Sequence, residues 1–305
     1  MGANTLPIRV IAEDGSEKIY NINITRKAGA TSLKNEIMKN TVITAEPTLT
    51  TSSNNSSDAS GLYVSTDTNT GDPTYYFRGN VENNYVSFAG QTWRIVRINE
   101  DGTIRMVMQD GINDNAEYAF NSNWENYTYM YYTNSNAKTQ LENWYQTNIG
   151  SKSDLAKNVA SGAYYCEQAK AKCSDGYESG SATMTTYNKY TPDFKCSSDG
   201  NNKGVVNASV GLLTYDEVVY AGGYHKQNND NYYLYNSAIH WWTMSPAGWS
   251  GPSKYAWSVW YVDTAGEITF NGVRRTYRLR PVLNLTADTQ ISDGDGTKEN
   301  PFVVE

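Results

Sequence analysis

Apolar and polar residues alternate on both sides of Asp14-Gly15 near the amino terminus. A period of two places apolar side chains on one face of a strand, and Asp-Gly favours a tight turn. The run "LPIRVIAEDGSEKIYNINIT", residues 6–25, therefore predicts a β-hairpin, to which we assign residues 1–28. Because a two-stranded hairpin is marginally stable in water, we expect this one to pack on another surface.

Residues 29–60 combine a short helical pattern with a polar segment. Leu33, Ile37 and Met38 lie on one helical face within "TSLKNEIMKN", which also offers an N-cap residue. The following "TLTTSSNNSSDASG" has nothing to bury. We therefore predict a short helix and a polar linker.

Short strands dominate the pattern of residues 61–305. Alternating runs predict strands at Val86–Phe88, Trp93–Ile95, Ile104–Met108, Ile268–Phe270 and Val282–Leu285. Apolar residues at third and fourth positions predict a helix in "NAKTQLENWYQTNI", and Thr214 with Glu217 forms a capping-box pattern for another. Pro281 predicts a strand start or a sheet edge. Few helices and many short strands indicate an α+β fold.

The composition favours a protein with a Tyr-rich binding surface and argues against nucleic acid or an anionic membrane as its partner. Hydrophobic residues make up 39% and charged residues 19% of the chain, whereas Tyr alone numbers 25. Tyr-rich, weakly charged surfaces are common in secreted binding proteins. The net charge of -7 argues against nucleic acid and against an anionic membrane surface, since both require a basic patch. The first residues lack a signal-peptide pattern, so we expect an export signal or anchor absent from this chain, and membrane contact only through it.

The three cysteines indicate a disulfide rather than a metal site. Cys166, Cys173 and Cys196 form no CxxC pair, and both histidines are far from them in sequence. A disulfide between Cys166 and Cys196 is favoured, because it closes a long loop rich in Gly, Ser, Asp and Lys. The alternative is three reduced thiols in a cytosolic protein.

Recognisable catalytic and metal-binding motifs are missing from the sequence. There is no HExxH, P-loop or GxSxG word. Asp216 and Glu217 lie at a predicted helix start, where carboxylates stabilise the helix dipole. Residues 293–301, "DGDGTKENP", lack the remaining ligands of a calcium loop and predict a turn between two terminal strands. We predict no catalysis, no cofactor and no metal; an enzyme that uses His225 or His240 is the minor alternative.

Residues 240–262 carry five of the eight tryptophans. In "YAWSVWYVD" alternate residues face opposite sides of a strand, so aromatic side chains lie on both faces. One face must cover the core, and the other is predicted to present aromatic rings to a ligand. For Trp241, Trp242 and Trp260, burial in the core is an equally good interpretation. Trp249, in the loop "AGWSGPS", is favoured as exposed.

Several short sequence motifs occur in the same order as in a known protein family, which this chain therefore resembles. These motifs are "FAGQTWRIVRINEDGTIR", "LENWY", "YYCEQ", "DFKC", "VGLLTYDEVVYAGG", "WWTMSP", "VWYVDTAGEI", "RPVLNL" and "DGDGTKENPFVV". Together they resemble bacterial surface proteins with a C-type-lectin-like fold, which is shared with formylglycine-generating enzymes and retroelement-variable proteins. The amino-terminal hairpin resembles the last two strands of a cadherin-like β-sandwich repeat.

This resemblance implies a C-type-lectin-like domain over residues 61–305, with short antiparallel strands, a few helices and a ligand-facing surface near the carboxyl terminus. The calcium-binding motifs of true C-type lectins are missing, and the last hundred residues contain no cysteine. Calcium-dependent sugar binding and oxidase chemistry are therefore not implied. Arg278 stands where the family has Gly, which predicts a different approach to the following strand.

We therefore predict an extracellular or cell-surface adhesin-like module that binds a protein or glycan on another cell or surface. The expected contact residues are Trp249, Tyr255, Trp257, Tyr261, Arg274, Arg275 and Tyr277. Aromatic faces can stack on sugar rings, and Arg can bind carboxylates. A structural domain of a surface fibre or pilus, in which the hairpin joins neighbouring domains, is the main alternative.

Overall fold

The computed structural model describes residues 3–25, 29–49, 58–168, 191–197, 204–225, 227–250 and 255–305. Of these, the side chains of residues 3–5, 23–25, 249–250 and 255–257 are not described. Cys173 lies outside the described residues.

The strands are β1 (Ala3–Ile11), β2 (Glu17–Thr25), β3 (Thr31–Ser32), β4 (Val42–Ile43), β5 (Gly61–Ser65), β6 (Thr74–Arg78), β7 (Tyr85–Phe88), β8 (Gln91–Ile98), β9 (Ile104–Met108), β10 (Glu117–Ala119), β11 (Tyr164–Cys166), β12 (Val205–Asn207), β13 (Tyr224–His225), β14 (Trp241–Ser250), β15 (Tyr255–Val262), β16 (Glu267–Gly272), β17 (Thr276–Arg278), β18 (Val282–Leu285), β19 (Gln290–Asp293) and β20 (Phe302–Val304). The helices are α1 (Leu33–Ile37), α2 (Ile112–Asn115), α3 (Asn136–Tyr145), α4 (Ser153–Ala156) and α5 (Tyr215–Ala221), with 3₁₀ turns η1 (Tyr127–Met130) and η2 (Tyr132–Asn134) and a π-helical turn η3 (Gln146–Gly150).

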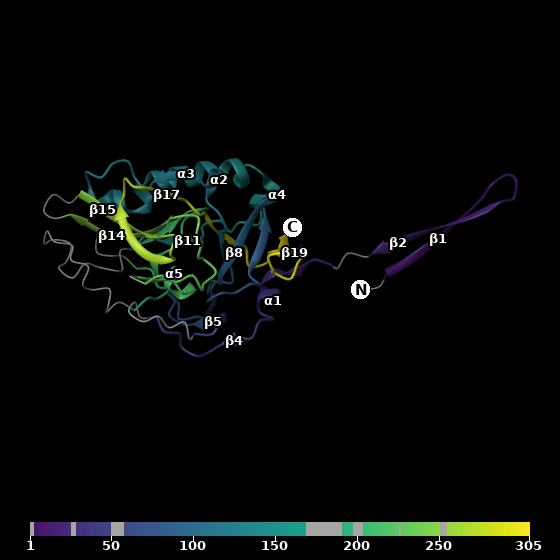
Figure 1. Cartoon of the computed structure of the whole chain (residues 1–305), viewed down its shortest axis with the longest axis horizontal. Helices are drawn as coiled ribbons and strands as arrows, with labels where there is room; N and C mark the ends of the chain where they lie inside the picture. The colour runs from purple at the N-terminus through teal and green to yellow at the C-terminus, as the bar shows by residue number, and fades with distance from the viewer. Residues whose placement is uncertain are drawn as a thin grey trace.

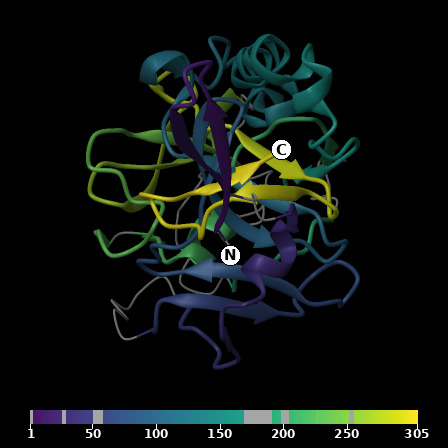
Figure 2. The same ribbon diagram turned by 90° about the vertical axis from the view of Figure 1, so that its right-hand side faces the viewer.

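Two larger sheets and a few short helices form the folded body (Figure 1). One sheet has the order β3-β19-β20-β7-β8-β6-β5-β4, and β9 joins it to β18. The other has the order β10-β17-β14-β15-β16-β13. Most strand pairs are antiparallel, and helices α2, α3 and α4 gather on one side of the sheets (Figure 2). The α+β prediction is confirmed.

The amino-terminal hairpin forms as predicted but does not pack on the body. Strands β1 and β2 pair over nine residues, and Gly15 adopts a left-handed φ of 81° in the turn. The hairpin extends away from the rest of the chain (Figure 1), and its apolar residues are 41–63% exposed. The rest of the described chain does not supply the surface on which we expect the hairpin to pack.

The predicted helix near the amino terminus belongs to the body rather than to a linker. Ser32 caps α1 by accepting a hydrogen bond from Asn35 N, and Leu33 and Ile37 are completely buried in the core. Strand β3 pairs with β19, and β4 pairs with β5. Residues 31–43 thus share the sheet and core of residues 61–305; most of the low-complexity run, residues 50–57, lies outside the described residues.

Local signals predicted the central elements well. Strands β7, β8 and β9 form the expected meander, and α3 and α5 occupy the two predicted helices. Pro281 directly precedes β18, as expected for a strand start. The "DGDGTKENP" segment links β19 to β20.

Three tryptophans of the aromatic strands β14 and β15 are buried, and they lie on both faces of these strands. Trp241, Trp242 and Trp260 are at most 1% exposed. Trp260 packs between Tyr215 and Phe270 on one face, and η1 packs against β15. The core interpretation is therefore correct for these three tryptophans, because other elements cover the face that the strand pattern left open.

Candidate functional site

Two of the predicted contact residues meet on the sheet that contains β14. Tyr261 on β15 and Tyr277 on β17 stack with ring centroids 4.3 Å apart and planes inclined by 22°. Strand β14 lies between their strands, and the buried Trp242 ring lies 4.6 Å from Tyr277. Both tyrosines are only partly buried. We name this stacked pair the tyrosine surface.

Hydrogen bonds fix the tyrosine surface. Asn271 Nδ2 donates to Tyr277 Oη at 2.9 Å. Burial and a hydrogen bond to Tyr277 raise the pKa of Tyr261, so its hydroxyl stays protonated at neutral pH. The His240 ring lies 5.5 Å from Tyr277, and its Nδ1 has no hydrogen-bond partner among the described residues. The surface thus presents aromatic rings with tyrosine hydroxyl and Asn271 amide groups.

The predicted arginines lie in the turn between β16 and β17, beside the tyrosine surface. Arg274 and Arg275 are exposed. The Arg274 guanidinium lies 4.8 Å from the ring centre of Trp124, which is itself 37% exposed. Sequence reasoning missed Trp124, whose only signal is a single indole in the polar run "NSNWENY".

Arg278 has a structural role. Its Nη1 pairs with Glu117, and its Nε donates to the Asn115 carbonyl at 3.2 Å. Since Glu117 lies opposite Arg278 in the β10–β17 register, the pair holds the edge strand in place. The long cation is accommodated by partners from α2 and β10.

The remaining predicted residues cannot be placed at the level of side chains. The backbones of Tyr255 and Trp257 lie on β15. Trp249 lies in strand β14, where it pairs with Ala256, so its assignment to a loop is wrong: cross-strand pairing extends β14 to Ser250. The side chains of all three predicted residues lie outside the described part. The structure therefore brings together Tyr261 and Tyr277, with Arg274 and Arg275 in the adjoining turn.

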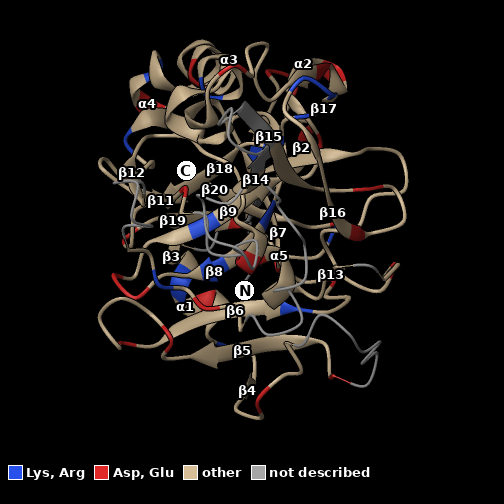
Figure 3. Cartoon of the chain, turned by 90° about the vertical axis from the view of Figure 1, so that its left-hand side faces the viewer, with Lys and Arg blue, Asp and Glu red and all other residues tan. Residues whose placement is uncertain are grey.

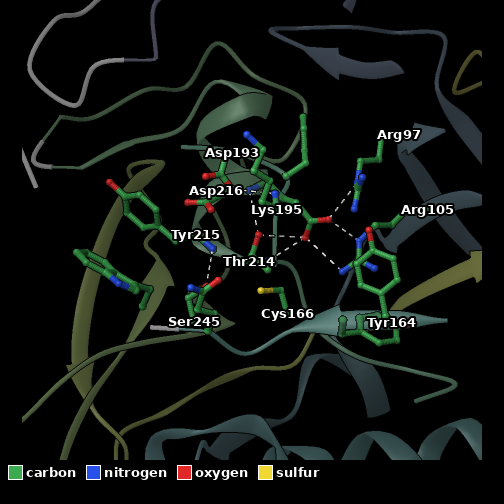
Figure 4. Close-up of a pocket in the computed structure, with 15 residues that line it drawn as sticks. Arg97, Arg105, Tyr164, Cys166, Asp193, Lys195, Thr214, Tyr215, Asp216 and Ser245 are labelled. Carbon is green, nitrogen blue, oxygen red and sulfur yellow. Dashed lines mark hydrogen bonds and ion pairs between the residues drawn. The ribbon is translucent and has the colours of Figure 1, made fainter. Parts of the chain in front are cut away.

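A second region, which sequence reasoning missed, is a hollow of about 510 Å³, counted with its open mouth (Figure 4). We name it the Glu217 hollow. Its charged lining residues are Arg97, Arg105, Asp193, Lys195, Asp216 and Glu217. They come from β8, β9, α5 and the segment 191–197, and Figure 3 shows the basic positions of β8 near the acidic positions of α5.

Glu217 is the centre of this hollow. It is 3% exposed, and its Oε1 lies 2.5 Å from Arg105 Nε and 3.4 Å from Arg97 Nε. Its Oε2 accepts a hydrogen bond from Thr214 N at 2.9 Å, which completes the predicted capping box. Glu217 therefore pairs with two buried cations in addition to capping α5, and Glu100 is a second counter-ion of Arg97 at 3.6 Å.

Several polar groups of the Glu217 hollow already have partners, either in its lining or just outside it. Tyr164 Oη donates to Glu100 at 2.7 Å, and Ser245 Oγ accepts from Tyr215 N at 2.9 Å. Lys195 pairs with Asp67 at 3.0 Å. Neither histidine is among the lining residues. These interactions stabilise the fold. The tyrosine surface is therefore a better candidate for ligand contact than the Glu217 hollow.

Stability should fall as acidification protonates Glu217. Burial alone would raise its pKa, but Arg105, Arg97 and the Thr214 backbone N–H together lower it below the ordinary 4.5. Because the folded pKa is the lower one, the stabilisation is complete above about pH 4.5 and is lost as the pH falls through the folded pKa. Urea denaturation at stepwise lower pH measures this loss. Glu217→Gln should flatten the profile; an unchanged profile in that variant contradicts the assignment.

The predicted disulfide between Cys166 and Cys196 is confirmed, with Cα atoms 5.7 Å apart. It ties the segment 191–197 to β11. In that segment Phe194 stacks on Tyr220 at 4.0 Å, and Cys196 N donates to Asn69 Oδ1 at 2.8 Å. The disulfide therefore holds one wall of the Glu217 hollow.

Comparison with protein-family models, curated proteins and solved structures gives no match. The resemblance to C-type-lectin-like surface proteins stays a prediction. Among the described residues, no group of three or more His, Cys, Asp or Glu side chains could hold a metal ion. No helix in the described ranges has the length and apolar character needed to cross a membrane.

Proposed function

We propose that this chain is a non-catalytic, extracellular ligand-binding module of the adhesin type, with a C-type-lectin-like body. The observation that carries the proposal is the partly exposed Tyr261–Tyr277 stack, which is held over buried Trp242. Rings fixed by packing bind with little loss of conformational entropy. The tyrosine surface is thus a prepared contact area.

The neighbouring groups favour a polar, negatively charged ligand. Arg274 and Arg275 are exposed beside the tyrosines, and guanidinium forks bind carboxylates in bidentate geometry. Aromatic faces stack on sugar rings or fill protein pockets. An acidic glycan, or a protein patch rich in carboxylates, fits both features.

The disulfide supports a location outside the cytosol, since disulfides persist in oxidising compartments. A structural role in a surface fibre is the second candidate. It is favoured by the exposed hairpin, which could join neighbouring domains.

Binding should fall when the exposed arginines are removed. We expect wild-type protein to bind on a glycan array that includes sialylated and uronic-acid glycans, or on an array of extracellular proteins. The double variant Arg274→Ala, Arg275→Ala should bind about 10- to 100-fold more weakly, because loss of two Arg contacts of about 0.7–1.4 kcal/mol each has this effect on the affinity.

The matched control is Lys152→Ala, Lys157→Ala, which removes the same charge from exposed positions flanking α4. Its affinity should stay within about twofold of wild type, as expected for charges outside the contact area. Equal losses in both double variants would indicate nonspecific electrostatics. The absence of any hit on both arrays would contradict the proposed function.

A further inference from the structure

One face of the amino-terminal hairpin carries a continuous apolar stripe. We name it the hairpin stripe; its members are Leu6, Ile8, Val10, Tyr20 and Ile22. Cross-strand pairing places Leu6 opposite Ile22 and Ile8 opposite Tyr20. Each member is 41–51% exposed. The stripe thus runs along the hairpin without cover from the described chain.

The opposite face has a different character. Arg9 pairs with Glu17 across the strands, and Pro7 lies opposite Asn21. Ile11 and Ile19 also lie on this face, but they alternate with that ion pair. Only the hairpin stripe offers neighbouring apolar side chains on both strands.

We infer that the hairpin stripe is a homodimer contact, in which the stripes of two copies pack face to face about a twofold axis. Its five residues expose on the order of 450 Å² in each copy, so complete burial of both stripes would remove on the order of 900 Å² from solvent. That area is just below the range of stable, specific interfaces and is typical of weak, transient ones. The dimer is therefore expected to be weak and concentration-dependent.

Charge placement fits an antiparallel arrangement. Val10 pairs with Lys18 at the turn end of the stripe, and the Lys18 ammonium lies 5.2 Å from the Tyr20 ring centre. Leu6 and Val10 are four residues apart, so an antiparallel pair centred on Ile8 keeps the two Lys18 groups about 14 Å apart, at opposite ends of the stripe. The twofold packing therefore avoids like-charge repulsion.

The shape of the molecule permits this packing. The hairpin projects from the body (Figure 1), so two antiparallel hairpins place the bodies at opposite ends of the pair. Pro7 lacks a backbone N–H and weakens β1 as an edge for strand addition. Face-to-face packing also covers the apolar side chains of the hairpin stripe, which edge-to-edge pairing through β2 would leave exposed.

Sedimentation velocity of the full chain from about 1 to about 200 µM, the range in which small interfaces associate, tests the inference. Wild type should shift reversibly from monomer to dimer. Ile8→Asp on the hairpin stripe should weaken the dimer at least about tenfold, because a buried carboxylate is strongly disfavoured. Ile19→Asp, on the opposite face and 63% exposed, is the matched control and should dimerise like wild type.

Disulfide trapping in a Cys173→Ser background separates loss of contact from loss of hairpin structure. Ile8→Cys lies at the middle of the stripe and should form a covalent dimer on mild oxidation, whereas Ile19→Cys should not. Wild type that remains monomeric at every concentration overturns the inference. Equal dimerisation of Ile8→Asp and wild type, or equal loss in Ile8→Asp and Ile19→Asp, also overturns it.

Discussion

Replacing Glu217 with Gln should destabilise the chain by about 3–5 kcal/mol, the cost of breaking a buried ion pair from one side. Arg97 and Arg105 are at most 5% exposed, and both direct their guanidinium groups at this carboxylate. The neutral amide removes the carboxylate that the two cations share, so that Arg97 keeps only Glu100 and Arg105 keeps no ion pair among the described residues. Guanidinium denaturation at neutral pH measures the loss.

Glu142→Gln is the matched control. It makes the same chemical change on α3, where the Glu142 side chain is 45% exposed and pairs with Lys138 four residues earlier. An exposed helical pair contributes about 0.3–0.5 kcal/mol. A loss below about 1 kcal/mol in Glu217→Gln would show that burial of the charges has been overestimated.

Removing the disulfide should cost about 3 kcal/mol. Cys166 and Cys196 are 30 residues apart in sequence, and closing a loop of that length lowers the entropy of the unfolded chain by roughly this amount. The double variant Cys166→Ser, Cys196→Ser should unfold at lower denaturant concentration. The segment 191–197 should also become susceptible to proteolysis, because the disulfide ties it to β11.

Cys173→Ser retains the disulfide and serves as the control. It should unfold within about 0.5 kcal/mol of wild type, as is usual for substitutions that leave such features intact. The assignment of the pairing would be contradicted if Cys173→Ser lost as much stability as the double variant. Reduction of wild type with dithiothreitol should reproduce the behaviour of the double variant.

Elements defined by short-range signals could be predicted from the sequence. The Asp14-Gly15 turn and the Thr214–Glu217 capping box depend on residues within a few positions of one another. The Cys166–Cys196 pairing also followed from composition and spacing, because few partners were available. In these cases the conformation that neighbouring residues favour is also the one found in the tertiary structure.

Features that depend on distant segments could not be predicted. The guanidinium group of Arg105 reaches Glu217 across 112 positions, so the pattern around α5 reveals only a cap. The burial of Trp260 depends on Tyr215 and Phe270, which lie on other elements. Strand periodicity shows that both faces of β15 are aromatic, but it does not show which layers cover them.

The candidate site was predicted in part for the same reason. Tyr261 and Tyr277 both belonged to the expected contact set, but their stacking depends on β14 lying between β15 and β17. Trp124 arrives beside Arg274 from a separate polar segment. A contact surface assembled from three segments has no signature within any one of them.

The central claim is that the tyrosine surface, rather than the Glu217 hollow, contacts the ligand. The most direct test measures the affinity of Tyr277→Ala and Tyr164→Ala, by titration calorimetry, for the strongest binder found on the arrays. Both tyrosines are partly buried, and Tyr164 lines the hollow. Tyr277→Ala should bind at least about tenfold more weakly and Tyr164→Ala like wild type, since aromatic anchors dominate contact energy. Wild-type affinity in a folded Tyr277→Ala variant, together with a loss in Tyr164→Ala, would contradict the account.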